Sequence, residues 1–366
     1  MTIDPTSAHE KTFAGRAAWS AGDFESRGDL TTPIPAAVLR DLDDGLASIQ
    51  RQGKGLETRT GRREKIGTVT SAGQELVDFQ ELSGSAADCP SIFSRLPATD
   101  FHSKPLTAFT RTVRRDLLSG CGFVILRGLP IARYSPDEAG IVYGGIGSAL
   151  GVTLPQNAKG ERLYSVRNEG YSVSKDYGAS GVRYSKTTEP FHFHTDSAPN
   201  LAGPAPDFIG LLAIQTAKSG GESVLVSAQS THNILLAEHR PSLEQLYRPL
   251  HYDRTAEWQP GEPRTLVAPV FRFERWLQMR YMRFYIEQGH ARAGAPLTSG
   301  QTAALDHLDA VMDRPGQHLR IALKAGDMLF LNNHLVLHSR TAFEDHPEPE
   351  RRRHYVRMWL ATPQDA

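Results

Sequence analysis

The spacing of apolar residues changes along the chain, from helical in the first part to mainly strand-like further on. Residues 35–52 and 104–118 repeat apolar side chains every three or four positions, which predicts two helices. Residues 122–128 form a short apolar run between glycines, which predicts a buried strand. Ser135 precedes a proline and stands three residues before Glu138, the pattern of a capped helix start.

Beyond residue 200 short apolar runs dominate, and helical patterns interrupt them only twice. Helical spacing occurs at 228–238 and 299–312, and the predicted strands are 207–216, 222–226, 268–273, 277–282, 318–323, 327–332 and 353–361. No alternation of strands and helices and no glycine-rich phosphate loop occurs, so a nucleotide-binding parallel sheet is not expected. The pattern predicts a mainly β fold with helical flanks, either a sandwich or a barrel. We find no internal boundary and expect a single domain over 1–366.

Composition narrows the partners and the compartment. Acidic and basic side chains balance at 41 each, so neither a nucleic acid nor an anionic membrane surface is favoured as a partner. Only two cysteines occur, Cys89 and Cys121, which suits a reducing compartment and excludes a zinc site of four cysteines. No apolar run is long enough to cross a membrane, and the N-terminal residues are polar. We therefore expect a cytoplasmic protein.

The sequence Phe-His-Phe-His-Thr-Asp at 191–196 is the first candidate for chemistry. In an extended strand alternate side chains share a face, so His194 and Asp196 would point the same way. Two imidazoles and one carboxylate on one side of an ion form the facial triad of non-haem Fe(II) oxygenases, with three positions left open. A second histidine must then come from elsewhere in the chain.

The same triplet occurs twice more, so the pattern alone does not select the site. His307 and Asp309 lie in a helical pattern, where residues two apart diverge, and we set them aside. His251 and Asp253 lie in a strand-like stretch and remain a rival pair.

Three downstream segments provide the context. Residues 220–223 read Gly-Gly-Glu-Ser, residues 326–343 read GDMLFLNNHLVLHSRTAF, and residues 351–359 read RRRHYVRMW. In this order and spacing they resemble the TauD/TfdA (taurine dioxygenase) family of Fe(II)- and 2-oxoglutarate-dependent oxygenases, within the clavaminate synthase-like group. The resemblance covers roughly residues 105–362, and residues 1–100 form an N-terminal extension without an assignment. It implies a double-stranded β-helix, or jelly roll, with helical insertions.

The resemblance also implies roles for individual residues. It assigns iron binding to His194, Asp196 and His338, the last within His-Ser-Arg-Thr-Ala-Phe. It places the hydroxyl of Ser223 near the co-substrate and pairs Arg353 with the distal carboxylate of 2-oxoglutarate. Arg357, four residues later, matches a second arginine that faces the co-substrate or the substrate in relatives.

Physical reasoning supports the arginine assignments. A buried carboxylate needs a paired charge, and the planar guanidinium of arginine suits it better than lysine does. Arg353 and Arg357 are an even number of residues apart and would share one face of an extended strand.

Two further histidines compete with these ligands. His334 is also even-spaced from His338, and we interpret it as structural. His192 would share a face with His194 and line the substrate pocket. By position near the motifs, the predicted substrate contacts are His192, Gln156 (with Asn157), Tyr164, Arg183 and Phe343.

The predicted activity follows from this set. With Fe(II), 2-oxoglutarate and O2, the protein would hydroxylate, desaturate or cyclise a small molecule such as an amino acid, a carboxylate or a natural-product intermediate, and release succinate and CO2. Related halogenases replace the carboxylate ligand with a small residue, so Asp196 favours hydroxylation over halogenation. The alternatives are a cupin-like enzyme that uses His192 and His194 without 2-oxoglutarate, and a ligand-binding protein without activity. A homo-oligomer and the substrate's identity stay open.

Overall fold

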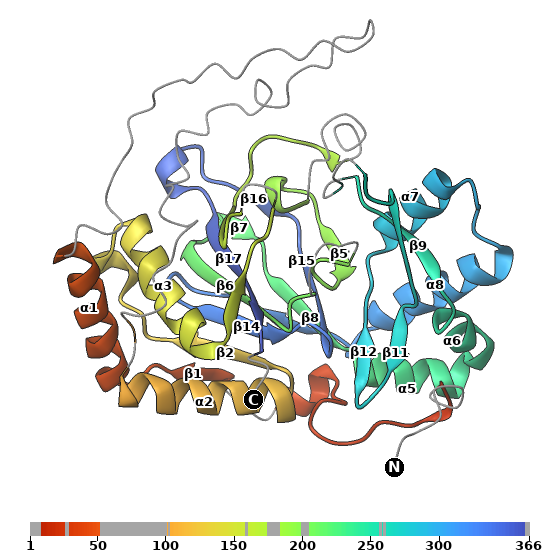
Figure 1. The fold of residues 1–366 in the computed structure, drawn as a ribbon, viewed down its shortest axis with the longest axis horizontal. Helices are drawn as coiled ribbons and strands as arrows, with labels where there is room; N and C mark the ends of the chain where they lie inside the picture. The colour runs from red at the N-terminus through yellow and green to blue at the C-terminus, as the bar shows by residue number, and fades with distance from the viewer. Residues whose placement is uncertain are drawn as a thin grey trace, which may run out of the picture.

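Two β-sheets stacked face to face form the centre of the protein (Figure 1). The computed structural model describes residues 9–25, 29–51, 101, 103–157, 160–173, 184–198, 205–255, 258 and 261–362. The larger sheet runs in the order β1 (Thr31–Pro33), β2 (Phe123–Arg127), β14 (Met328–Asn332), β6 (Phe208–Gln215), β17 (His354–Ala361) and β3 (Val152–Leu154), with β4 (Leu163–Val166) also paired to β17. The smaller sheet runs in the order β13 (Leu319–Ile321), β8 (Ser223–Ser227), β15 (Val336–Arg340) and β5 (Phe191–His194).

The two sheets share one apolar core. Ile209, Leu329 and Tyr355 of the larger sheet pack in the same cluster as Leu225 and Val336 of the smaller one, and all five are buried. Side chains on alternate positions of a strand point to opposite faces, so each sheet contributes one face to this layer.

Helices cover the outside of this core in two groups (Figure 1). The first group packs on the larger sheet and comprises α1 (Ala36–Arg51), α2 (Lys104–Ser119) and α3 (Pro136–Leu150). The second group packs beside the smaller sheet and comprises α5 (Ala228–Glu238), α6 (Arg240–Leu246), α7 (Arg283–Ala293) and α8 (Ser299–Met312). Three strand pairs complete the described fold: β9 (Leu250–Asp253) with β10 (Thr265–Ala268), β11 (Phe271–Phe273) with β12 (Leu277–Met279), and β7 (Ser219–Gly220) with β16 (Phe343–Glu344).

Local sequence explains where the helices lie and where they begin. Helix α1 buries Val38, Leu42 and Ile49 on one stripe, as helical periodicity requires. Helix α3 begins with the predicted capping box, because the Ser135 hydroxyl accepts from the backbone N–H of Glu138 and the Glu138 carboxylate accepts from that of Ser135.

Most predicted elements are confirmed, but one predicted strand is divided and several observed elements had no prediction, among them α6, β4 and α7. The strand expected over 268–273 is divided, since β10 ends at Ala268 and β11 begins at Phe271. Helix α7 had no sequence prediction, because its buried side chains are few and follow no clear stripe. Among the described residues, no helix combines the length and the apolar character that crossing a membrane requires.

Candidate active site

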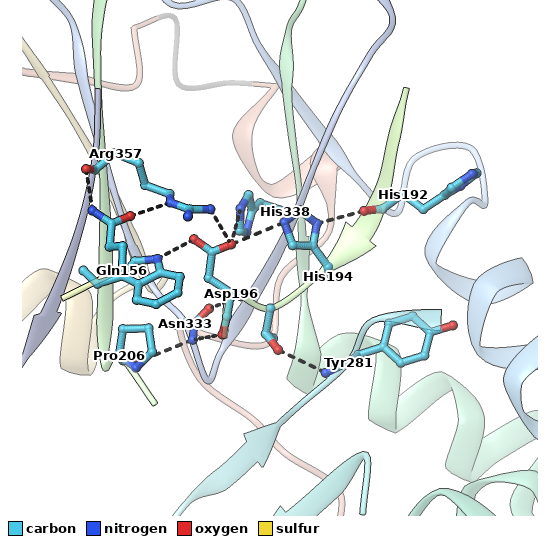
Figure 2. A network of polar contacts seen from close by, with 11 residues as sticks. Gln156, His192, His194, Asp196, Pro206, Tyr281, Asn333, His338 and Arg357 are labelled. Carbon is cyan, nitrogen blue, oxygen red and sulfur yellow. Dashed lines mark hydrogen bonds and ion pairs between the residues drawn. The ribbon is translucent and has the colours of Figure 1, made fainter. Parts of the chain in front are cut away.

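Neighbouring strands of the smaller sheet bring two histidines together. His194 at the end of β5 lies directly opposite His338 on β15, and their ring centroids are 4.1 Å apart. The carboxylate of Asp196 completes a cluster in which one ligand atom from each of the three residues lies within 4.8 Å of the others. All three side chains are buried, and Figure 2 shows them pointing toward one another.

Asp196 reaches this cluster from a turn, which corrects the sequence prediction. Strand β5 ends at His194, so the two residues do not share one extended strand. The Asn333 side chain fixes the turn, because its oxygen accepts from the Asp196 N–H at 2.9 Å and its nitrogen donates to the Asp196 carbonyl oxygen at 3.2 Å. Two bonds with Tyr281 hold Thr195, one from the Thr195 N–H at 2.9 Å and one to its hydroxyl at 3.0 Å. The turn thus points the Asp196 carboxylate toward His194, as the alternation of side chains along a strand was expected to do.

His192 does not share the face of His194, because β5 is irregular. The register against β15 places His338 opposite His194 but Arg340 opposite Phe191, so β5 has one extra residue in this interval, a β-bulge. Phe191 therefore stacks on the His194 ring, with centroids 3.7 Å apart. The exposed His192 side chain points away from the cluster (Figure 2).

Two donors from β17 hold the Asp196 carboxylate. Arg357 Nη1 donates to Oδ1 at 3.2 Å, and the indole N–H of Trp359 donates to Oδ2 at 2.8 Å. Burial would raise the pKa of Asp196, but the Arg357 guanidinium and the two imidazoles outweigh it. The pKa of Asp196 therefore lies well below its usual range, and the group is a carboxylate at neutral pH.

Both imidazoles present a nitrogen to this carboxylate. His194 Nδ1 lies 2.9 Å from the carbonyl oxygen of His192 and must carry the proton, because a carbonyl only accepts. His194 Nε2 lies 3.6 Å from Asp196 Oδ1, and His338 Nε2 lies 4.0 Å from the same oxygen. Burial and the neighbouring His194 ring lower the pKa of His338 to about 3, so this ring is neutral. Two imidazoles and a carboxylate are the ligand set of a non-haem Fe(II) site.

The surroundings of His194 Nε2 show whether these residues could bind a metal ion. This atom is buried and has no hydrogen-bond partner among the described residues. Buried polar atoms are almost always partnered, so an orphan atom that faces a carboxylate calls for a cation between the two. The residues present therefore fit a divalent metal ion.

Arg353 forms a second unsatisfied group. Its side chain is 4% exposed, and its Nε and Nη1 have no hydrogen-bond partner within the described part of the chain. The guanidinium lies 3.7 Å from the ring centroid of Tyr355 and 5.2 Å from that of Phe343. Burial lowers its pKa, although the group stays charged at neutral pH. Gly221, with φ of +72°, packs behind it, and an added Cβ there would lie 3.3 Å from Nε.

Arg340 is a third buried arginine, which lies within the His-Ser-Arg-Thr-Ala-Phe motif but had no predicted role. Its guanidinium lies 4.8 Å from Phe343, and Nη2 donates to the carbonyl oxygens of Thr187 and Glu189. Burial and the charge of Arg353 lower its pKa to about 9. Ser223 lies opposite Arg340 in the register of β8 with β15.

A cavity opens beside Asp196, and both aromatic and polar side chains line it. It is lined by Arg357 and, among others, by Tyr184, Phe191, Met282, Tyr285 and Trp359. Trp359 had a sequence signal, since it continues the even spacing of Arg353 and Arg357. Met282 and Tyr285 had none, because tertiary packing alone brings α7 to the site.

None of the predicted substrate contacts that the structure describes lines this cavity. Gln156 instead holds Arg357, since its amide oxygen accepts from Nε at 2.8 Å and its nitrogen donates to the Arg357 carbonyl oxygen at 2.9 Å. Tyr164 packs under Arg357, with 5.3 Å between the guanidinium and the ring centroid. Phe343 lies between Arg340 and Arg353. Arg183 is outside the described residues.

The rival histidines have structural partners. His334 lies in the turn after β14 and contacts the Asp207 carboxylate at 3.1 Å. His307 lies in α8 and bonds to the Ser242 hydroxyl at 2.8 Å. Within the described ranges, the three-residue cluster of His194, Asp196 and His338 is the one group of three side chains placed to hold a metal ion.

Comparison with known proteins agrees with this chemistry. Residues 94–359 match the family described as taurine catabolism dioxygenase TauD, TfdA family. The chain belongs to the TauD/TfdA family. As a member it is a 2-oxoglutarate-dependent non-haem iron dioxygenase, with Fe(II) as its metal and 2-oxoglutarate and O2 as co-substrates. The alternative of a ligand-binding protein without activity is thereby excluded.

Individual relatives of this TauD/TfdA protein are distant. FR-33289 synthase of Streptomyces rubellomurinus is 30% identical over 96% of this chain and 91% of its own length. The taurine hydroxylase-like protein SAT17 of Stachybotrys chartarum is 28% identical over 65% of this chain and 60% of its own.

Solved structures show the same fold. Asparagine oxygenase with Fe(II), 3-hydroxyasparagine and succinate has a TM-score of 0.62 at 16% identity, over 91% of this chain and 94% of that one. The non-haem iron oxygenase OrfP with Fe and α-ketoglutaric acid has a TM-score of 0.57 at 13% identity, over 92% and 95%. The predicted double-stranded β-helix core is thus confirmed.

Proposed function

We propose that His194, Asp196 and His338 hold Fe(II) and that the site hydroxylates a small molecule that carries an anionic group. The observation that carries the proposal is the convergence of two buried imidazoles on one ionised carboxylate, with His194 Nε2 left without a hydrogen bond among the described residues. Such a set binds an octahedral ion on one side and leaves three positions open.

Arg353 supports 2-oxoglutarate as the co-substrate. Its two partnerless N–H groups lie in a buried pocket beside Phe343 and Tyr355, where a carboxylate would find a paired charge and little competing water. We assign the distal carboxylate to Arg353 and keep Ser223, whose strand pairs with β15 in the same sheet, as a neighbouring hydroxyl.

When bound, Fe(II), 2-oxoglutarate and O2 supply the oxidising chemistry, in which 2-oxoglutarate becomes succinate and CO2 and one oxygen atom goes to the substrate. The protein's part is binding and orientation. The three ligands would fix the ion, Arg353 would fix the far end of the co-substrate, and the aromatic side chains of the cavity would pack against the substrate. Because Asp196 occupies the position that halogenases leave vacant, we infer hydroxylation rather than halogenation.

Arg357 supports an anionic substrate. It lines the cavity, and its Nη2 has no hydrogen-bond partner among the described residues, whereas Nε and Nη1 are held by Gln156 and Asp196. A guanidinium held on two sides presents its remaining N–H in a fixed direction, which suits an anionic group of the bound molecule.

The test is a substrate screen under O2 with Fe(II) and 2-oxoglutarate, read out as succinate formed and as the mass of the added compound. The panel holds amino acids, because the asparagine oxygenase and OrfP structures contain hydroxylated asparagine and arginine, and it holds other carboxylates and natural-product intermediates. Each acid is paired with its primary amide. We expect acids to raise succinate formation and to gain one oxygen atom, and their amides to do so at least ~10-fold less. Equal stimulation by acid and amide would overturn the anionic substrate, and a gain of chlorine would overturn hydroxylation.

A further inference from the structure

The two oxygens of the Asp196 carboxylate have different surroundings. Both histidine Nε2 atoms are nearest to Oδ1, at 3.6 Å for His194 and 4.0 Å for His338, and Arg357 donates to the same oxygen. Oδ2 instead accepts the indole N–H of Trp359 at 2.8 Å. A carboxylate oxygen has two lone-pair positions, so Oδ1 can bind a metal while it keeps the Arg357 bond.

The strand that carries Trp359 fixes the indole. Trp359 is paired to Ile209 on one side of β17 and to Leu154 on the other, and its side chain is 3% exposed. The guanidinium of Arg357 lies 4.9 Å from its ring centroid, so two stacked groups of one strand approach the carboxylate together. An indole N–H only donates and cannot bind a cation, so it holds Oδ2 without competing for the metal.

We propose that Trp359 is a positioning residue that restricts Asp196 to binding iron through one oxygen. The proposal deepens the proposed function and rests on it. If Oδ2 were released, the carboxylate could bind through both oxygens and occupy a fourth position on the ion. Only two positions would then remain, whereas a chelating co-substrate and O2 together need three. Trp359 thus keeps open the third coordination position that the reaction requires.

The direct test is the infrared difference spectrum between Fe(II)-loaded and metal-free protein, recorded without O2 and with carboxyl-labelled aspartate. A carboxylate bound through one oxygen shows a wide separation between its asymmetric and symmetric stretches, and one bound through two oxygens shows a narrow separation. We expect a wide separation in the wild type and a narrow one in Trp359→Phe. Replacement of Trp359 by 3-benzothienylalanine, which keeps the ring shape without the N–H, gives the same result even where Phe perturbs packing.

Trp19→Phe is the matched control. Trp19 is also 3% exposed and also donates its indole N–H at 2.8 Å, but to the carbonyl oxygen of Cys121 in the bend before β2. We expect its aspartate spectrum and its affinity for 2-oxoglutarate to equal those of the wild type. In Trp359→Phe the affinity of the Fe(II) protein for 2-oxoglutarate should fall about 10-fold or more, within the range typical of lost ligand support.

The outcomes separate the two proposals. If the wild type shows the Fe(II)-dependent aspartate bands but Trp359→Phe and the benzothienyl variant match it in band separation and in 2-oxoglutarate affinity, the role of Trp359 is wrong and the iron site stands. If the wild type shows no Fe(II)-dependent aspartate band, the ligand assignment itself is wrong and the inference fails with it.

Discussion

The His-x-Asp triplets at 194–196 and 251–253 share a sequence pattern but differ in the residues that surround them in the structure. His251 and Asp253 lie within the regular strand β9. Asp253 is fully buried and accepts from Arg292 Nε at 2.6 Å and from the Thr255 hydroxyl at 2.9 Å. The backbone N–H of His251 donates to His290. This triplet resembles a strand-borne metal site in sequence, yet its carboxylate has structural partners.

The triplet at 194–196 fits the strand pattern less well, yet it contributes to the cluster that we propose as the metal site. Its strand ends at His194, a bulge turns His192 away, and a turn held by Asn333 delivers Asp196. What distinguishes it is the third residue, His338, and a buried ring nitrogen without a partner. Unsatisfied polar atoms that converge therefore identify the site better than local periodicity does.

Replacement of Asp196 and replacement of Asp253 should change different properties of the protein, and this is the largest difference that we expect. Asp196→Ala removes a ligand, so Fe(II) affinity should fall by more than the ~10–100-fold typical of a residue that only supports a ligand, and turnover should vanish. Asp253→Ala should leave Fe(II) affinity unchanged and lower the free energy of unfolding by ~1–3 kcal/mol, because the Arg292 bond is lost. Equilibrium dialysis and denaturant unfolding measure both. Unchanged iron binding in Asp196→Ala would contradict the assignment.

Replacement of Arg353 and replacement of Arg292 should also differ in their effect on the affinity for 2-oxoglutarate. Arg353→Ala should weaken 2-oxoglutarate binding by roughly 10–100-fold, since a charge-assisted hydrogen bond contributes about 1.5–3 kcal/mol. Arg353→Lys should recover only part of the loss, because an ammonium cannot reproduce the fork. Arg292→Ala is the control and should leave 2-oxoglutarate affinity unchanged. A titration of 2-oxoglutarate into Fe(II)-loaded protein measures the effect, and equal affinity of Arg353→Ala and wild type would contradict the role.

Replacement of Gln156 tests the role of Arg357, whose side chain Gln156 holds in place. Gln156→Leu removes the acceptor of Arg357 Nε and should raise the KM for an anionic substrate by about 3–10-fold, with a smaller change in kcat. Fe(II) affinity should stay the same, because the ligands are untouched. Gln50→Leu, which removes a surface bond to Glu138, controls for loss of a glutamine. A change confined to kcat would show that Gln156 acts on the reacting atoms and not through Arg357.

His232 shows that a buried histidine alone does not mark the site. Its Nε2 bonds to the Tyr247 hydroxyl at 2.9 Å, its Nδ1 has no described partner, and burial lowers its pKa to about 4. As the pH drops from 7 to 5, His232 binds a proton in the unfolded chain but stays neutral in the folded one. The free energy of unfolding therefore falls over this range. This histidine should account for about 1–2 kcal/mol of that fall. Unfolding of His232→Gln at both pH values should show a shallower dependence, with Fe(II) affinity unchanged, and an identical dependence would refute the assignment.

The sequence predicted most of the elements because their signals are local. Helices α5 and α8 match 228–238 and 299–312, and the Ser135 capping box forms as written. The motifs identified His338 and Arg353 because the resemblance rests on order and spacing. Both side chains are buried where the structure brings the motifs together.

The rest depended on long-range contacts that periodicity does not encode. A bulge in β5 reversed the expected face of His192, since one extra residue shifts the alternation. Gln156 turned toward Arg357, which is 201 residues away in sequence. The cavity wall includes Tyr285 from α7, a helix whose apolar stripe was too weak to predict.

The most direct test of the iron site needs no substrate. Metal-free protein is mixed with Fe(II) and 2-oxoglutarate without O2, and the visible charge-transfer band of the chelate is recorded for the wild type, His192→Ala and His338→Ala. We predict the band in the first two and its loss in the third, because we assign His338 as a ligand, whereas His192 is exposed and lies outside the cluster. A folded wild type without the band, or a band that is lost in His192→Ala and kept in His338→Ala, would contradict it.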